Sequence, residues 1–326
     1  MFFIKLYQFT DLVMFDTINL RLTQADLQGR VDFLSELPGL LTDVSFTEKD
    51  TGEIWARGNL GNLTIRCCRF SMSVKDGSLC RWYLGDNYQV LSRGDTERAI
   101  EQLSDSLHLP MSRAAVTRVD VGASMIVRYP VRVYFDHLGE MARYNRLQQP
   151  SGLYYQQSNR VLCFYDKVAE ERKRRRATPE LYEGRNVLRY EDRITSRLPK
   201  TLRAPEVKAA MLYERRFYNR LLYQWRDHYK QIQKINQTNI NFQMVNTKKE
   251  LYRWGLLAGI ESIGGQAEML RQIAEAQQRG DLTPKQAYDL RAAVMSACEI
   301  DGGMITESDA ISELDKRVAE AVKMFS

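Results

Sequence analysis

The sequence predicts an α+β fold, with helices crossing a mostly antiparallel central sheet and a helical module at the C-terminal end. Three observations predict it. Short segments that alternate apolar and polar side chains, as strands do, fill residues 14–204. Turn signals such as Asp76-Gly77 separate several of these segments as hairpins. Segments with apolar residues at helical spacing lie between the hairpins and predominate after residue 204.

Strands are expected where the alternating segments end at turn residues. Those that enclose Asp50-Thr51-Gly52, Asp76-Gly77 and Ser158-Asn159 are expected to pair as hairpins, because Asp, Asn, Ser and Gly favour tight turns. In chain order, the expected strands are residues 17–22, 43–48, 53–59, 63–74, 78–84, 115–125, 153–157, 161–167 and 187–194.

Helices are expected where apolar residues recur every three or four positions. Thr23 and Pro130 mark two helix starts, since threonine caps helices and proline suits their first turn. Gly280 to Pro284 forms a turn followed by another start. The charged segment 168–176 is a helix or a loop, and 85–94 is a loop. The expected helices are residues 24–34, 95–107, 130–147, 205–234, 285–297 and 308–325.

The chain is expected to divide into four parts. Residues 1–13 are a loosely attached extension, since Met14 could itself be a start, or else a real first strand. Residues 14–204 form the sheet domain that carries the candidate site, and residues 205–246 complete its core with an aromatic, basic helix and a linker strand. Residues 247–326 form a helical module that shows no chemistry of its own.

Cysteine and histidine usage excludes two classes of site. The five cysteines and three histidines show no paired ligand spacing, so no zinc site is expected. An odd cysteine count without a secretion signal favours reduced thiols and a cytoplasmic protein. The apolar start is interrupted by Lys5 and Asp11 and is too short to span a membrane.

Positive charge is concentrated in one region. Residues 160–203 contain thirteen lysines and arginines against seven acids, an excess that equals the +6 net charge of the whole chain. This predicts a polyanionic partner such as nucleic acid, against the alternative of a solvated basic loop. The expected DNA-contacting residues are Arg118, Arg160, Arg172, Lys173, Arg174, Arg175, Arg176, Arg189 and Arg193.

Tyr165 and Lys167 are the candidate catalytic residues. On a strand at 161–167, Leu162 and Phe164 face the core, while Cys163, Tyr165 and Lys167 face the other way. A cation beside a phenol favours the phenolate and meets charge that develops on phosphorus, so Tyr165 could attack a phosphodiester. The alternative is an ordinary strand tyrosine beside an exposed lysine.

Two further strands supply candidate metal ligands. Alternation places Arg118 with Asp120 on one face and Arg189, Glu191 and Arg193 together on another. If these strands neighbour the tyrosine strand, Asp120 and Glu191 converge on its polar face. There they could bind Mg²⁺ or Mn²⁺, while the arginines hold flanking phosphates. The alternative is a set of cross-strand salt bridges, and no third metal ligand is identified.

The expected helix at 205–234 interleaves aromatic residues with arginines. Such a pattern suits stacking and phosphate contact with single-stranded DNA. It equally suits an amphipathic helix that packs its aromatic side chains on the sheet, and we expect about half of them to do so. The residues concerned are Tyr213, Arg215, Arg216, Phe217, Tyr218, Arg220, Tyr223, Trp225, Arg226 and Tyr229.

Four motifs occur together in a familiar order: MFDTINLRL, VTRVDVGASM, GLYYQQSNRVLCFYDKVAE and VLRYEDRI. Over roughly Met14 to Lys200 the chain resembles the filamentous-phage gene II/X replication initiators. It also resembles the related trans-acting initiation factors of rolling-circle plasmids and mobile elements. The resemblance implies a metal-dependent DNA nickase in which Tyr165 is the nucleophile, Lys167 the adjacent lysine, and Asp120 and Glu191 the acids. Many relatives carry a second acid shortly after the aspartate, where this chain has Gly122 and Ala123.

The expected function is therefore rolling-circle replication initiation. Tyr165 would nick one origin strand, retain its 5′-phosphate and free a 3′-hydroxyl, and a later transfer would rejoin the displaced strand. Expected partners are origin DNA, single-stranded or supercoiled, with a host helicase and polymerase, no membrane, and a second copy in a homodimer. Two alternatives stay open: a relaxase- or transposase-like strand transferase, and a sequence-specific DNA-binding protein without catalysis.

Overall fold

The computed structural model describes residues 13–29, 31–235, 239–240, 245–298, 305–306 and 309–323. The chain forms two compact units. The first comprises residues 1–234 and 313–326, and the second comprises residues 235–312. Nearly all of the expected extension at 1–13 lies outside the described residues, and Val13 begins the first strand. Within the described parts of the chain, every helix is too short or too polar to cross a membrane.

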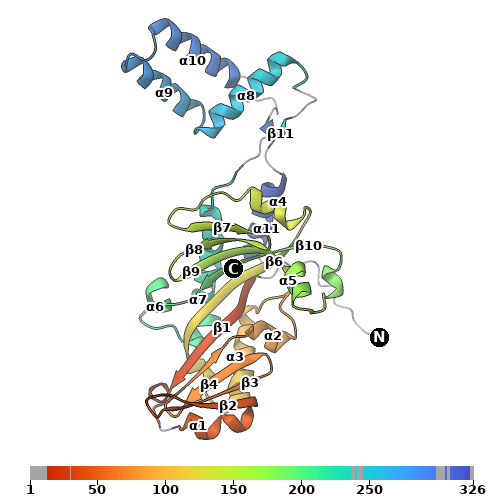
Figure 1. Ribbon diagram of the computed structural model, residues 1–326, viewed down its shortest axis with the longest axis vertical. Coiled ribbons are helices and arrows are strands. Elements are labelled where there is room, and N and C mark those ends of the chain that lie inside the picture. The colour runs from red at the N-terminus through yellow and green to blue at the C-terminus, as the bar shows by residue number, and fades with distance from the viewer. Residues whose placement is uncertain are drawn as a thin grey trace. The chain divides into compact units, whose positions relative to one another are not determined.

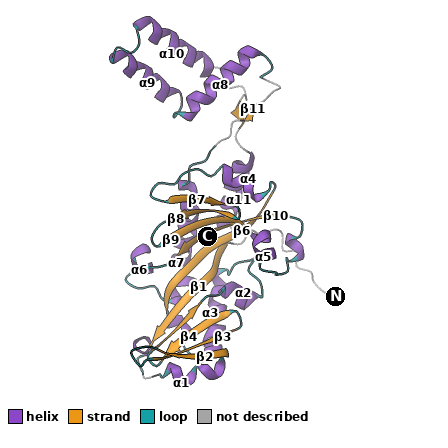
Figure 2. Cartoon of the chain, viewed as in Figure 1, coloured by secondary structure: helices purple, strands orange, loops and turns teal. Residues whose placement is uncertain are grey.

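One antiparallel sheet organises the first unit (Figures 1 and 2). Its ten strands lie in the order β2-β3-β4-β5-β1-β6-β10-β9-β8-β7, so the fold is α+β as predicted. The strands are β1 (Val13–Thr23), β2 (Thr42–Glu48), β3 (Ile54–Leu60), β4 (Leu63–Cys68), β5 (Ser71–Lys75), β6 (Ala115–Val127), β7 (Asn145–Gln149), β8 (Gly152–Gln156), β9 (Arg160–Asp166) and β10 (Asn186–Ile194).

Helices and single turns connect these strands. The α-helices are α1 (Phe33–Glu36), α2 (Leu79–Leu84), α3 (Arg93–Leu107), α4 (Val131–Asp136), α5 (Lys167–Lys173), α6 (Leu198–Thr201), α7 (Arg215–Gln231) and α11 (Asp309–Lys323). The 3₁₀ turns are η1 (Gln24–Leu27), η2 (Pro38–Leu40), η3 (Met111–Arg113), η4 (Glu180–Tyr182) and η5 (Ala209–Tyr213).

The two faces of the sheet differ in character. On one face the side chains are apolar and α7 packs on them, with the Trp225 and Tyr190 rings 4.8 Å apart and the Tyr218 and Phe15 rings 5.9 Å apart. This packing confirms the core role expected for part of the aromatic helix. The opposite face, here called the site face, carries polar side chains that include Arg21, Arg118, Asp120, Glu191 and Tyr165. Strand periodicity of two produces this separation.

Several expected elements differ from the structure. Residues 78–84 form no strand, because Ser78 accepts a hydrogen bond from the Arg81 amide and caps α2, and Gly85 ends it with φ of 90°. The expected strand 63–74 is itself a hairpin that turns between β4 and β5. Of the expected helix 130–147 only α4 forms, and the last residues of that segment belong to strand β7. The expected helix 24–34 is reduced to η1 and the start of α1.

The C-terminal helices divide between the two units. The second unit contains α8 (Lys248–Ser262), α9 (Gln266–Gln278) and α10 (Pro284–Cys298), packed around Ile260, Ile273 and Val294. The two-residue strands β11 (Asn239–Ile240) and β12 (Ile305–Thr306) pair with each other. From Glu313 onward α11 belongs to the first unit, although its sequence suggested membership of the C-terminal module.

Candidate active site on the sheet

Tyr165 stands near the end of β9, on the site face. Leu162 and Phe164 are fully buried on the opposite face, while Cys163 and Tyr165 both contact Glu191, as the alternation predicts. Tyr165 exposes only 7% of its surface. It lines two cavities, of about 760 Å³ and about 340 Å³.

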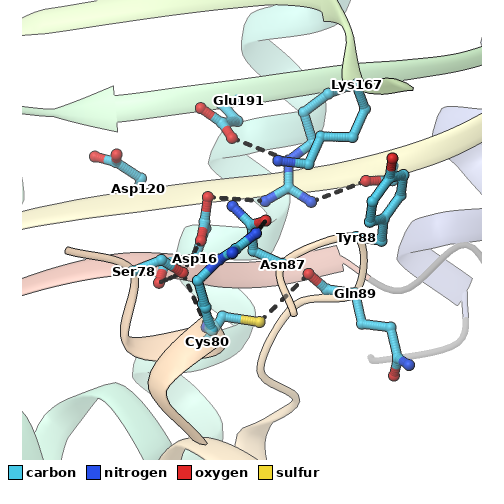
Figure 3. A network of polar contacts seen from close by, with 12 residues as sticks. Asp16, Ser78, Cys80, Asn87, Tyr88, Gln89, Asp120, Lys167 and Glu191 are labelled. Carbon is cyan, nitrogen blue, oxygen red and sulfur yellow. Dashed lines mark hydrogen bonds and ion pairs between the residues drawn. The ribbon is translucent and has the colours of Figure 1, made fainter. Parts of the chain in front are cut away.

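Three adjacent strands bring acidic side chains to this tyrosine. β10 pairs with β9 on one side and β6 on the other, which places Glu191 opposite Cys163 and Gly122. β1 pairs with β6, and the register of this pair shifts between Phe15 and Ile18. Asp16 lies within this interval and lines the smaller cavity. Figure 3 shows Asp16, Asp120 and Glu191 on these three strands. The predicted convergence of Asp120 and Glu191 is therefore present.

Gly122 occupies a position on β6 at which the structure leaves no room for a side chain. A Cβ atom at this position would lie 2.7 Å from Glu191 Cγ and 2.8 Å from the Tyr190 carbonyl oxygen. No side chain fits there without moving Glu191. The next residue, Ala123, is fully buried on the opposite face. Neither position could therefore carry a further acid for this site.

Glu191 is the centre of the polar network. Its Oε1 accepts hydrogen bonds from Tyr165 Oη at 2.8 Å and from Arg189 Nε at 2.9 Å. Its Oε2 accepts one from Arg193 Nε at 2.7 Å and a longer one from Cys163 Sγ at 3.6 Å. Burial would raise the pKa of Glu191, but Arg193 and Arg189 outweigh it and hold the pKa below its ordinary value. The carboxylate is therefore ionised.

The negative charge of Asp120 is less fully compensated by arginines than that of Glu191. Arg118 donates two hydrogen bonds to it, from Nε at 2.9 Å and from an Nη atom at 2.7 Å. Arg193 Nε is 3.9 Å from the same carboxylate. Burial raises the pKa of Asp120 to about 6, and the bonds from Arg118 offset only part of this effect.

The Tyr165 hydroxyl is a neutral donor in this arrangement. Burial, and then the adjacent Glu191 carboxylate, raise the pKa of Tyr165 well above its ordinary value. The expectation that a neighbouring ammonium favours the phenolate therefore does not describe this state. The hydroxyl is instead oriented by its 2.8 Å hydrogen bond to Glu191.

Lys167 has other partners than the expected ones. β9 ends at Asp166, whose side chain accepts a hydrogen bond from the Ala169 amide and caps α5, so Lys167 is a helix residue. Its Nζ is fully buried, donates to Glu170 at 2.9 Å and to Glu171 at 3.0 Å, and lies 6.0 Å from the Tyr165 ring centre. Arg81 of α2 also binds Glu171, at 2.6 Å. Both acids belong to α5 itself, so the ion pairs of Lys167 lie within this helix, and Arg81 connects Glu171 to α2.

The predicted DNA-contacting residues fall into three groups. Arg118 and Arg193 are partly exposed and line the smaller cavity. The tract at residues 172–176 is exposed except for the half-buried Arg176, and its members Lys173, Arg174 and Arg176 line one or both cavities. Two residues correct the prediction, because their guanidinium groups are buried in other pairs. Arg160 binds Asp192 on the opposite face, and Arg189 binds Glu191, Asp16 and Ser124.

Sequence reasoning missed two acids of this site. Asp16 lies 3.3 Å from an Arg189 Nη atom and accepts a hydrogen bond from Ser78. Glu171 anchors Lys167 and Arg81. The signal for Asp16 was present, since an aspartate interrupts the otherwise apolar start of β1. Nothing in the sequence pairs Glu171 with α2.

The oxygen atoms at this cavity are of the kind that a hard cation prefers, but their arrangement does not suit a bound ion. Asp16, Asp120 and Glu191 line one cavity together with Asn19, whose buried Oδ1 has no hydrogen-bond partner in the described part of the chain. Oxygen donors of this type are those that Mg²⁺ and Mn²⁺ prefer. The carboxylates are, however, engaged by arginines, and no three acidic, cysteine or histidine side chains among the described residues lie close enough to hold an ion. As arranged, the site is a carboxylate–arginine network and not a metal cage.

A comparison with known protein families covers this region. A family model for the N-terminal part of a replication-associated protein, the gene II protein of filamentous phages, matches residues 60–220. The matched segment contains Tyr165, Asp120 and Glu191 but not Asp16. None of the curated proteins matches the chain.

Proposed function

Because the chain belongs, through residues 60–220, to the gene II family of replication-associated proteins, which are DNA-binding initiators of rolling-circle replication, we propose that it nicks one origin strand with Tyr165. The observation that supports this most directly is the hydrogen bond from Tyr165 Oη to Glu191 at 2.8 Å. Tyr165 lines both cavities, so a strand bound in either would lie beside a tyrosine whose proton has an ionised carboxylate as its acceptor.

The proposed reaction is a transesterification. The phenolic proton passes along the existing hydrogen bond to Glu191, and Tyr165 Oη forms a bond to phosphorus. The bond from phosphorus to the 3′ oxygen breaks, and that oxygen takes a proton from water to become a 3′-hydroxyl. Tyr165 keeps the 5′-phosphate. The reverse attack by a 3′-hydroxyl rejoins a strand and returns the proton to the phenolic oxygen.

Arg193 connects substrate entry to the basicity of Glu191. Its side chain is 28% exposed, lines both cavities beside Tyr165, and is a main cause of the low pKa of Glu191. A phosphate that draws this guanidinium away leaves Glu191 a stronger base, and each pKa unit is worth about 1.4 kcal/mol. The entering strand would in this way prepare its own proton acceptor.

A metal remains part of the proposal. Asp120 and Glu191 are its proposed ligands, and Mg²⁺ or Mn²⁺ would supply charge neutralisation at the phosphate. Their carboxylates would first have to exchange arginine partners, which a bound phosphate would favour by competing for the same guanidinium groups.

A Tyr165→Phe variant tests the nucleophile. We expect it to form no covalent protein–DNA adduct on a supercoiled plasmid carrying the cognate origin, with DNA affinity and folding nearly unchanged. Glu191 retains both arginines, so only the loss of about one hydrogen bond, roughly 1 kcal/mol, is expected in stability.

Tyr154→Phe is the matched control, because Tyr154 lines the larger cavity on the same face. Tyr155 is no competitor, since it is buried on the opposite face and donates to the Gly139 carbonyl. Adduct mapped to Tyr154 by mass spectrometry, with Tyr165→Phe still active, would refute the assignment. Binding without any nicking by the unaltered protein would favour the non-catalytic alternative.

A further inference from the structure

A second cavity on the site face lies over the other half of the sheet. It measures about 700 Å³ and is lined by strands β1, β3, β4 and β5 and by the end of β2. We call it the basic pocket. Its charged and aromatic lining residues are Arg21, Lys49, Trp55, Arg57, Arg66 and Lys75.

The charge of the basic pocket has one sign. Five of its lining residues are cationic, and among the described residues no acid lines it. Lys49 and Arg66 have exposed acidic partners, Glu53 and Asp76, at 3.5 Å and 3.4 Å. Arg21, Arg57 and Lys75 are exposed, and no carboxylate among the described residues lies within ion-pair distance of them. An open cationic cavity of this kind attracts a polyanion.

The basic pocket shares one surface with the candidate active site. Arg57, Arg66, Ser73 and Arg21 lie opposite one another across four strands, so their side chains point to the same face. Two residues before Arg21, Asn19 lies opposite Arg118 and lines the active-site cavity. The polar surface is therefore continuous from Tyr165 to Arg57.

We propose that the basic pocket holds the phosphodiester backbone of the DNA that flanks the nicked site. The proposal rests on the proposed function, since it gives a second location to the same substrate. Five strand-to-strand steps separate β9 from β4, a distance of about 24 Å at about 4.8 Å per step. At about 3.4 Å per nucleotide of a duplex strand, this corresponds to about seven base pairs from the tyrosine. Trp55 lines the same pocket with the Lys49 ammonium 4.2 Å from its ring centre, so both side chains would lie beside a strand bound there.

The test compares two triple variants in the full-length Tyr165→Phe protein, which binds DNA without cleaving it. One carries Arg21→Gln, Arg57→Gln and Lys75→Gln. The other, the control variant, carries Lys230→Gln, Lys316→Gln and Lys323→Gln at exposed positions of α7 and α11, outside the basic pocket and the two active-site cavities, and loses the same charge. Binding to a fluorescein-labelled single strand of mixed sequence, and to its duplex, is measured from about 0.05 to 0.2 M salt.

We expect the basic-pocket variant to lose about one unit of salt slope per removed contact, and about tenfold in affinity per contact near 0.1 M salt. The control variant should keep most of its salt slope and most of its affinity. Loss with only one of the two DNA forms supports the proposal and identifies the bound form. Equal losses in the two variants, or an unchanged slope with both forms, would overturn it.

A fluorescence measurement locates the strand independently of affinity. DNA bound in the basic pocket changes the emission of Trp55, so Trp55→Phe should abolish most of the DNA-induced change. An identical change in Trp55→Phe would place the strand elsewhere. Because neither measurement depends on cleavage, a failure here is distinct from a failure of Tyr165 as nucleophile.

Discussion

Replacing Lys167 with methionine separates support of the fold from direct catalysis. The ammonium is fully buried, and Glu171, which it contacts at 3.0 Å, is 1% exposed. Methionine keeps much of the side-chain volume and removes the charge. The change leaves a buried carboxylate with Arg81 at 2.6 Å and Arg176 at 3.5 Å as its remaining partners.

The expected cost follows from this geometry. Removing one member of a buried ion pair typically costs about 3–5 kcal/mol, because the other charge stays buried. Arg81 still compensates Glu171, so we expect the lower end, about 3 kcal/mol, and a melting temperature lower by about 6–12 °C. Adding Glu171→Gln removes the stranded charge and should restore part of the loss, a coupling of about 1–3 kcal/mol.

Thermal and denaturant unfolding measure the stability, and single-turnover adduct formation measures the chemistry. If the main role of Lys167 is to compensate the buried Glu171 inside α5, the adduct rate should change little when the variant is assayed well below its melting temperature. If Lys167 instead donates to the phosphate in the reaction, its replacement should slow adduct formation about a hundred- to a thousandfold. A loss of that size with unchanged stability would refute the reasoning and restore the role suggested by the sequence.

Three further predictions concern charge, metal and pH. Reversing the charges at residues 174–176 should weaken DNA binding and flatten its salt dependence, and an unchanged slope would make that tract a solvated segment. Asp120→Asn and Glu191→Gln should each abolish nicking, as EDTA should, with DNA affinity retained; normal nicking in Mg²⁺ would reduce either acid to a salt-bridge partner. Burial lowers the pKa of Lys234 to about 8, so between pH 8 and its ordinary 10.5 the unfolded chain binds more protons and stability rises with pH. Denaturant titrations should show this rise flattened in Lys234→Met.

The site was predictable where strand periodicity governs it. Alternation alone placed Tyr165, Asp120 and Glu191 on polar faces, and the structure joins these faces because β10 lies between β6 and β9. That strand order is set by long-range pairing, which no local pattern encodes. The placement of Lys167 could not be predicted, because Asp166 is equally compatible with the end of a strand and with the cap of a helix.

Two further sequence predictions failed for different reasons. Asp76-Gly77 carries a strong turn signal, but the segment after it satisfies helix capping at Ser78 better than strand pairing. The burial of Arg160 and Arg189 was hidden because their partners come from other strands and from α7. Charge counting identifies a basic region but does not say which cations are neutralised inside the protein.

The return of α11 to the first unit makes residues 235–312 an insertion and not a tail. Glu313 accepts hydrogen bonds from the Tyr134 hydroxyl and the Arg128 amide, and Asp315 accepts one from Tyr229. A chain shortened at residue 234 would therefore lose a piece of its own core scaffold along with the helical module. A peptide joining residue 234 to residue 313 would instead remove the module and keep most of α11, and we expect a protease cut inside the module to leave two fragments still associated. The same architecture lets one such module be exchanged for another while the sheet is left intact.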